Sequence, residues 1–176
     1  MPDLRVALVG YGLAGRSFHA PLIEATLGLT LATVLTASPE RRAQLARDHP
    51  HAEVVDTPAQ VWERDDVDLV VVAAPNAAHA ELAHAAIARG LPVVVDKPLA
   101  VTAGEAEAVV RHAEEAGVVL TVFQNRRWDS DHLTLVRLIA DGRLGAVMRY
   151  ESRFERWRPR LREGAWREEV RLGRRA

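Results

Sequence analysis

The stretch that decides the fold is LRVALVGYGLAG at residues 4–15, close to the start of the 176-residue chain. Six mostly apolar residues lead directly into a G-x-G-x-x-G motif, and a helical pattern follows from about residue 14 to residue 25. A buried strand, a glycine-rich turn and a helix, in this order, are the context in which the motif binds a dinucleotide. The sequence therefore predicts an α/β protein that opens with a nucleotide-binding βαβ unit.

The glycines of this motif have separate tasks. Gly10 allows the tight turn, Gly12 lets a pyrophosphate approach the backbone, and Gly15 lets the helix pack closely on the strand. The first turn of the helix then offers free N–H groups to the phosphates. The alternative is a glycine-rich turn without a ligand. We favour dinucleotide binding, and the predicted cradle also includes the intervening residues Tyr11, Leu13 and Ala14.

Strand and helix patterns alternate as far as Phe123. The further strands are expected at Thr30–Leu35, Val54–Val55, Asp68–Ala73, Leu91–Val95 and Val118–Phe123. The helices after the first are expected at Ser38–Arg47, Thr57–Glu63, Asn76–Arg89 and Thr102–Ala116. Strands that are apolar on both faces indicate a parallel sheet covered by helices on both sides. Residues 1–123 are therefore predicted to form a doubly wound Rossmann domain that binds a dinucleotide.

The pattern changes after Phe123. Residues 130–140 read as a helix, and residues 147–157 alternate between apolar and charged side chains, which is typical of a half-buried strand in a different sheet. A lone strand is not stable and needs a partner from later in the chain or from another subunit. Residues 124–176 are therefore predicted to hold a linking helix and the first strand of an incomplete α+β substrate or dimerisation domain. Pairing of that strand would make the protein a homo-oligomer.

Composition limits the class of protein. Hydrophobic residues make up 48% and charged residues 27%, and the net charge is −1, which excludes a disordered chain and argues against general binding to nucleic acid. Residues 149–176 carry ten arginines against five glutamates, but no nucleic-acid motif accompanies them, so we expect a solvated surface. No cysteine is present, which removes thiolate metal sites and suits a reducing cytoplasm. His49 and His51 are not accompanied by further side chains at metal-ligand spacing, so no metal is predicted.

Nothing in the sequence suggests a membrane partner. The longest unbroken apolar run, Leu69–Pro75, is far too short to cross a bilayer. The first residues lack the basic region of a signal peptide, and their apolar run breaks at Gly10. We therefore expect a soluble cytoplasmic protein.

Lys97 is the only lysine among 23 basic residues. In a chain so strongly biased toward arginine, a lysine marks a place where chemistry that arginine cannot perform, the release of a proton, is expected. The alternative is the chance survival of one surface lysine.

The end of the second strand bears on the choice of dinucleotide. An NAD site usually has an Asp or Glu about 20 residues after the motif, where it binds the ribose 2′-hydroxyl. No acid stands directly at the end of this strand, whereas Ser38 and either Arg41 or Arg42 could hold a 2′-phosphate. The alternative is that residues 40–42 are only the solvated first turn of a helix. We predict NADP as the preferred cofactor and NAD as the alternative.

Four segments together resemble the Gfo/Idh/MocA family of NAD(P)-dependent oxidoreductases: residues 10–15 (GYGLAG), 74–79 (APNAAH), 96–98 (DKP) and 125–129 (NRRWD). Residues 18–21 (FHAP) and Arg158-Pro159 resemble its scyllo-inositol dehydrogenase branch in particular. The likeness runs from Leu4 to about Glu168. It implies hydride transfer between a nicotinamide and a secondary alcohol or ketone of a cyclitol or sugar.

The resemblance implies roles for the matching residues. Pro75 and Asn76 would line the nicotinamide side of the cofactor. Lys97 matches the lysine of the family's E-K-P motif, beside the nicotinamide and the reacting carbon, with Asp96 in place of the usual Glu. Three consecutive residues would lie at the substrate edge, namely Arg127, Trp128 and Asp129. His79 is expected to support its helix, and His19 is assigned no catalytic duty.

The chemistry of an amine agrees with the role implied for Lys97. The cofactor accepts a hydride from the alcohol, and the protein must handle the hydroxyl proton. A free lysine, with a pKa of about 10.4, is protonated at neutral pH, so burial or the positive nicotinamide ring would have to lower that value. The negative charge of Asp96 would oppose this lowering of the lysine pKa unless its side chain points to the other face of the sheet. Pro98 keeps Lys97 extended at the strand end.

The sequence departs from the family at its C-terminal end. After a segment like Trp166-Arg167-Glu168, the family continues with a glycine-rich segment and a helix whose Asp and His complete the site, and residues 169–176 match neither. This predicts a truncated or frameshifted member. Loss of a general acid–base group typically costs about 10²–10⁴ in rate, so the activity of the shortened chain is in question. The alternative is a catalytically inactive nucleotide-binding or interaction module.

Overall fold

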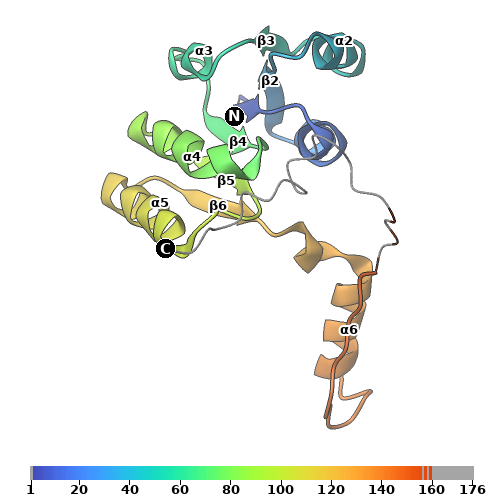
Figure 1. The fold of residues 1–176 in the computed structure, drawn as a ribbon. Coiled ribbons are helices and arrows are strands. Elements are labelled where there is room, and N and C mark those ends of the chain that lie inside the picture. Colours follow the sequence, from blue (N-terminus) through green and yellow to red (C-terminus); the bar gives the residue numbers. More distant parts are fainter. Residues whose placement is uncertain (1, 156, 158, 160–176) are drawn as a thin grey trace. The chain divides into compact units, whose positions relative to one another are not determined.

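Six parallel strands form one sheet in the first part of the chain (Figure 1). The structure is a computed structural model that describes residues 2–155, 157 and 159. The strands are β1 (Leu4–Val9), β2 (Leu29–Leu35), β3 (Glu53–Val55), β4 (Leu69–Val72), β5 (Val93–Asp96) and β6 (Leu120–Phe123). They lie in the order β3-β2-β1-β4-β5-β6, and each neighbouring pair is parallel. This order confirms the predicted doubly wound Rossmann sheet.

Helices connect the strands of this sheet. They are α1 (Ala20–Ala25), α2 (Pro39–Asp48), α3 (Pro58–Trp62), α4 (His79–Ala88) and α5 (Ala103–Ala116), with a π-helical turn η1 (Gly15–His19) and a 3₁₀ turn η2 (Asn76–Ala78). The predicted caps are present at α5, where the Thr102 hydroxyl accepts the N–H of Glu105 at 3.2 Å and Gly117 ends the helix at φ 64°. The first helix differs from the prediction because residues Gly15–His19 are π-helical and the α-helix α1 begins only at Ala20.

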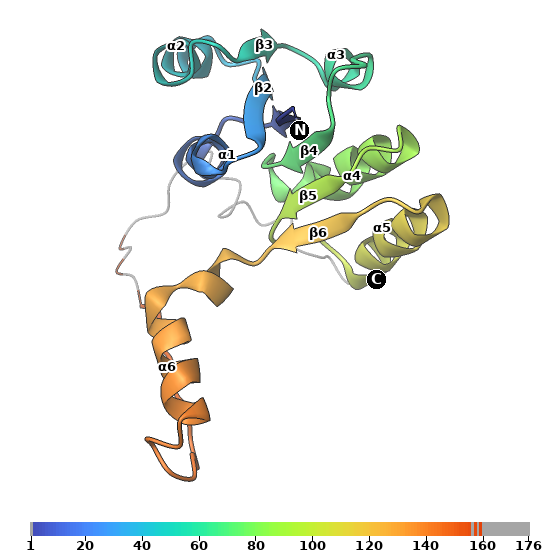
Figure 2. The same ribbon diagram turned by 180° about the vertical axis from the view of Figure 1, so that it is seen from behind.

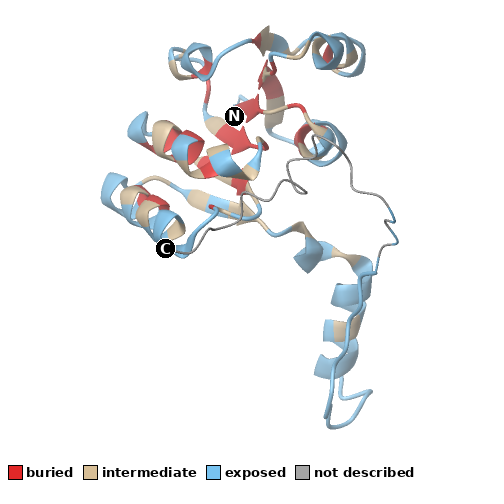
Figure 3. Ribbon diagram, viewed as in Figure 1, coloured by how far each residue is buried: buried red, intermediate tan, exposed pale blue. Residues whose placement is uncertain are grey.

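Two apolar cores fill the spaces above and below the sheet. Side chains of α3, α4 and α5, among them Val61, Ile87 and Val109, pack on one face, and all three are almost fully buried. Helices α1 and α2 cover the other face (Figure 2). Ile23 of α1 and Leu45 of α2 belong to the core on that face. The buried residues concentrate in the strands and on the helix faces that meet them (Figure 3). The pairing of β1 with both β2 and β4 places the reversal of strand order at the C-terminal end of β1, where such sheets bind ligands.

The chain divides into two units, Met1–Gln124 and Asn125–Ala176. The second unit begins with a 3₁₀ turn η3 (Asn125–Trp128) and continues into α6 (Ser130–Ala140), which matches the predicted helix. The strand predicted over residues 147–157 is not formed: residues 147–155 and residue 157 have no regular structure. A strand requires a partner, and none of the described residues of this unit supplies one. The predicted homo-oligomer contact through that strand therefore stays a prediction.

Part of the sequence interpretation concerns residues outside the description. Arg158 and the Trp166-Arg167-Glu168 segment lie outside the described residues. In the described part of the chain, no helix combines the length and the apolar character that crossing a bilayer requires.

Candidate functional site

The glycine turn is built from tight backbone contacts on two sides and open space on the third. A Cβ atom at Gly10, which has φ +107°, would lie 2.6 Å from the carbonyl oxygen of Ala73 beyond β4, and one at Gly15 would lie 2.0 Å from the carbonyl oxygen of Gly10. A Cβ atom at Gly12 would meet nothing within 4 Å. The outer glycines are therefore required for packing, whereas Gly12 keeps one side of the turn clear for a ligand. This arrangement fits a bound pyrophosphate.

Tyr11 fastens the turn to the sheet and to α2. Its side chain is buried, and its hydroxyl donates a hydrogen bond to Asp48 Oδ2 at 3.3 Å. Arg16 Nε donates to the same oxygen at 2.8 Å. Burial, and then the Asp48 charge, raise the pKa of Tyr11 to about 12. The Tyr11 side chain is thus committed to the fold, which leaves its main chain for the predicted cofactor contact. Of the other cradle residues, Leu13 is exposed and Ala14 is half-buried.

The end of β2 distinguishes the two candidate arginines. Ser38 Oγ caps α2 by accepting the N–H of Arg41 at 3.4 Å. Arg42 Nε donates to the carbonyl oxygen of Thr36 at 3.2 Å, and its guanidinium pairs with Asp56. The guanidinium of Arg41 is exposed and makes no hydrogen bond or ion pair within the described residues. Arg41 is therefore the arginine that is free to meet a ligand here.

The end of β4 carries the second predicted cofactor segment. Pro75 is exposed, and Asn76 is half-buried in the first turn after it. His79, which is 1% exposed, lies with Nδ1 2.7 Å from the carbonyl oxygen of Pro98 and Nε2 2.8 Å from that of Ala74. A neutral imidazole has one N–H and donates to one of these carbonyls at a time. His79 therefore joins the loop after β4 to the loop after β5, which is more than the support of its own helix that the sequence suggested.

Lys97 stands immediately after β5. Its side chain is exposed, and its ammonium makes no ion pair within the described residues. Its N–H donates to Asp96 Oδ1 at 2.8 Å, so the neighbouring carboxylate contacts the main chain of Lys97. The Lys97–Pro98 peptide bond is cis. Lys97 thus presents an unpaired amine at the same edge of the sheet as the glycine turn and Pro75.

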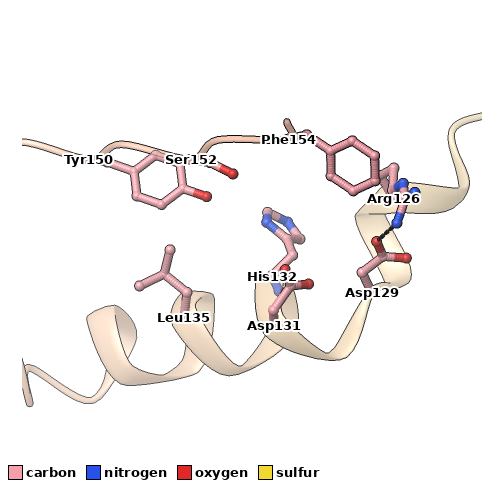
Figure 4. A pocket seen from close by; sticks show the side chains of 8 residues that line it. All are labelled: Arg126, Asp129, Asp131, His132, Leu135, Tyr150, Ser152 and Phe154. Atoms are coloured by element: carbon pink, nitrogen blue, oxygen red, sulfur yellow. Dashed lines mark hydrogen bonds and ion pairs between the residues drawn. The ribbon is translucent and has the colours of Figure 1, made fainter. Parts of the chain in front are cut away.

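The second unit holds the predicted substrate residues and a cavity of its own. Arg127 and Trp128 are exposed, and Asp129 accepts a hydrogen bond from Arg126 Nη1 at 2.6 Å. A cavity of about 530 Å³ lies between α6 and the segment that follows it (Figure 4). Its lining residues are Arg126, Asp129, Asp131, His132, Leu135, Tyr150, Ser152 and Phe154. Of the three predicted substrate residues, Asp129 alone lines it.

Sequence reasoning missed Asp48, and it missed the contacts that His79 and His19 make. Asp48 and His79 make the contacts described above, and His19 is buried beside the ring of Phe123. His19 and His79 stand in segments that carry the family resemblance, but no local pattern shows their contacts, and none distinguishes Asp48 from a surface residue. Within the described residues, no group of three His, Asp or Glu side chains is arranged to hold a metal ion.

Comparison with known proteins decides the family. The sequence model described as "Oxidoreductase family, NAD-binding Rossmann fold" (GFO_IDH_MocA) matches residues 4–124, well over half of the chain. The chain belongs to the Gfo/Idh/MocA family. The match covers β1 to β6 and the glycine turn, and it ends where the first unit ends.

Individual Gfo/Idh/MocA relatives extend the likeness beyond the first unit. The uncharacterized oxidoreductase YdgJ of Escherichia coli is 46% identical over 95% of this chain and 47% of its own length. The scyllo-inositol 2-dehydrogenase (NADP(+)) IolW of Bacillus subtilis is 38% identical over 94% of this chain and 45% of its own. The solved structure of the YPO2259 oxidoreductase of Yersinia pestis superposes with a TM-score of 0.87 at 46% identity, over 95% of this chain and 47% of that one. The chain therefore spans about half the length of these relatives.

Proposed function

We propose that this chain binds NADP along the carboxyl edge of its sheet and contributes to hydride transfer between the nicotinamide and a secondary alcohol or ketone of a cyclitol or sugar. The observation that carries the proposal is the turn at residues 10–15, closed by packing at Gly10 and Gly15 and open at Gly12. It lies where the strand order reverses, and Lys97 immediately follows a strand of the same sheet. Family membership supports oxidoreductase chemistry.

The preference for NADP over NAD rests on the end of β2. The unpaired guanidinium of Arg41 and the hydroxyl of Ser38 lie at the first turn of α2, and a 2′-phosphate suits a free arginine. An acid that would bind the 2′-hydroxyl of NAD is missing from the end of the strand. One relative, IolW, carries NADP(+) in its name. NAD remains the alternative cofactor.

The chain's own residues would orient the cofactor, move the proton and contact the substrate. When bound, the nicotinamide supplies the hydride acceptor or donor. Pro75 and Asn76 would orient the ring from the end of β4. Lys97, whose ammonium has no carboxylate partner in the described residues, would take up or release the hydroxyl proton at Nζ. In the second unit, Arg127, Trp128 and Asp129 would serve the substrate edge. A cyclitol or sugar follows from the inositol dehydrogenases among the relatives.

A second candidate function is binding of the nucleotide without turnover. The observation that favours it is the second unit, in which none of the described residues is buried and no strand is formed. Positioning a substrate requires a rigid surround. In this function the first unit binds NADP(H) through the glycine turn, and the second unit offers an interaction surface.

Calorimetric titration with NADPH and NADH tests the cofactor assignment. We expect Gly12→Ala to weaken binding of both, because a methyl group occupies the space where the pyrophosphate approaches. Arg41→Gln should weaken NADPH binding about tenfold or more through loss of a charged hydrogen bond, and leave NADH binding unchanged. The control is Arg47→Gln, an exposed arginine at the other end of α2. NADH binding at least about tenfold tighter than NADPH binding would overturn the preference.

Turnover separates the two candidate functions. The assay follows NADPH consumption with scyllo-inosose, using the wild-type chain, Lys97→Ala and Lys97→Arg. Arginine keeps the positive charge but does not release its proton. Turnover that is lost in both variants supports the oxidoreductase, whereas tight NADPH binding without any turnover supports the binding module.

A further inference from the structure

His19 is a buried imidazole with an unsatisfied nitrogen. It ends the π-helical turn η1, its side chain is 4% exposed, and its Nε2 has no hydrogen-bond partner among the described residues. Leaving a buried polar atom unpaired is destabilising, a cost that an apolar residue of similar size would avoid. A polar side chain held at this position therefore calls for an explanation beyond packing.

The strand register shows what His19 faces. The ring of Phe123 lies 4.4 Å from the imidazole, centroid to centroid, at the end of β6. Phe123 is paired in register with Asp96 at the end of β5. Residues paired in register on neighbouring parallel strands project to the same face of the sheet. The Asp96 side chain thus lies on the face that carries the His19 ring, one strand from Phe123.

The His19 imidazole lies within range of the Asp96 charge. Burial lowers the pKa of His19, and the carboxylate of Asp96 works against this shift in the direction of a higher pKa. Because the net shift is downward, His19 is neutral near pH 7 and carries one N–H that it can donate.

Asp96 in turn contacts the main chain of Lys97. Its Oδ1 accepts the N–H of Lys97 at 2.8 Å. Asp96 therefore shares a face of the sheet with His19 and makes a hydrogen bond to the residue proposed to move the proton. A carboxylate held on the main chain of Lys97 is kept away from the ammonium of the same residue.

We propose that His19 is a positioning residue: it orients the carboxylate of Asp96, and through Asp96 it sets the main chain and the amine of Lys97. The importance of this link for catalysis rests on the function proposed above for Lys97. His19 does not touch substrate in this arrangement, because its ring is buried against the sheet.

The single lysine of the chain gives a direct test, because an amine-directed reagent labels Lys97 and, as a separate peptide, the N-terminus. Labelling of the Lys97 peptide is followed by mass spectrometry across a pH series. We expect His19→Gln to slow labelling about threefold near about pH 8, because the released carboxylate is free to approach the ammonium. Asp96→Asn should speed it, because the negative charge is gone. His19→Gln added to Asp96→Asn should have no further effect.

Matched variants separate this role from packing. His19→Phe keeps a ring against Phe123 and removes the unpaired nitrogen, so it should fold and should slow labelling as His19→Gln does. His51→Gln alters an exposed histidine that contacts Glu24, and it should leave labelling unchanged. The proposal is overturned if His19→Phe labels like the wild type, or if the His19 effect persists in the Asp96→Asn background.

NADPH titration of the same variants keeps this inference distinct from the proposed function. If the wild-type chain fails to bind NADPH but the labelling pattern holds, the proposed function is wrong and the link from His19 to Lys97 stands. If NADPH binds and labelling is unaffected by His19, the link is wrong and the cofactor assignment stands.

Discussion

In residues 2–124 the sheet lies between two layers of helices that bury most of its central apolar side chains, whereas from Asn125 to residue 155 none of the described residues is buried. The contrast does not come from composition. The second unit has its own large apolar side chains, such as Trp128 at 77% and Met148 at 92% exposed. What it lacks, in the described residues, is a second layer to pack against. Burial of an apolar side chain contributes about 1.5–3 kcal/mol only when another element covers it.

The difference teaches where this chain's function can be placed. Every predicted contact with the dinucleotide falls in the unit that has a core: the glycine turn, the end of β2, the end of β4 and Lys97 after β5. The predicted substrate residues fall in the unit that has none. A rigid frame is what holds reacting groups in place. The first unit is therefore expected to bind nucleotide by itself, and the predictions below test whether the two units differ as this reasoning requires.

The largest effect is expected from Gly15→Ala. Its Cβ would lie 2.0 Å from the carbonyl oxygen of Gly10, which is backbone and has no room to yield. We expect loss of cooperative folding of the first unit, measured by urea unfolding followed by circular dichroism. Gly12→Ala is the matched control, because its Cβ meets nothing within 4 Å and its unfolding midpoint should be close to that of the wild type. Equal stabilities of the two variants would contradict the packing account of the turn.

A smaller effect is expected in the centre of the sheet. Leu31 on β2 is completely buried in the core beneath α1 and α2. Leu31→Ala should lower the free energy of unfolding by about 2–5 kcal/mol, through lost burial and the cavity left behind. The measurement is the urea midpoint at constant m-value. A loss below about 1 kcal/mol would mean that the core is loosely packed.

Tyr11→Phe should act mainly at high pH. The folded chain raises the pKa of Tyr11 from 10.0 to about 12, so the unfolded chain loses this proton first as the pH rises. The wild type should therefore lose stability between about pH 10 and 12, and the phenylalanine variant should lose less over that range. At neutral pH the variant lacks the bond to Asp48, worth about 0.5–1.5 kcal/mol. Thermal melts across this pH range check both effects. If the melting temperatures of the wild type and the variant fall equally with pH, the loss of stability does not come from the Tyr11 hydroxyl.

The smallest effect is expected in the second unit. Leu133 on α6 is 46% exposed. Leu133→Ala should change the free energy of unfolding by no more than about 0.5 kcal/mol, because exposed substitutions rarely do more. It is the direct counterpart of Leu31→Ala, with the same change of side chain in the other unit. A loss comparable to that of Leu31→Ala would show that α6 is covered in solution and would remove the contrast between the units.

Most of the first unit is readable from local sequence. The glycine turn, the six strands and the caps at Ser38, Thr102 and Gly117 follow from patterns within a few residues. The predicted strand at residues 147–157 shows the limit of such patterns. Alternation of apolar and charged side chains indicates that a segment is suited to a sheet, but a strand exists only where another strand supplies its hydrogen bonds.

The candidate site divides in the same way. The sequence alone identified the glycine motif, the solitary Lys97 and the two arginines at the end of the second strand. It left open whether Asp96 would hold the Lys97 ammonium and which arginine would be free. The structure answers both, since Asp96 accepts the Lys97 N–H and Arg42 is tied to Asp56.

The amino-acid sequence by itself determined the order of strands and helices along the chain, the position of the glycine turn and the residue types at the ends of the strands. Only the tertiary structure decided that His79 joins two loops and that His19, Phe123 and Asp96 meet on one face. The physical reason is the distance along the chain over which each kind of interaction acts. Turns, caps and periodicity depend on neighbours within one or two helical turns, whereas contacts between residues a hundred positions apart depend on which strands lie side by side.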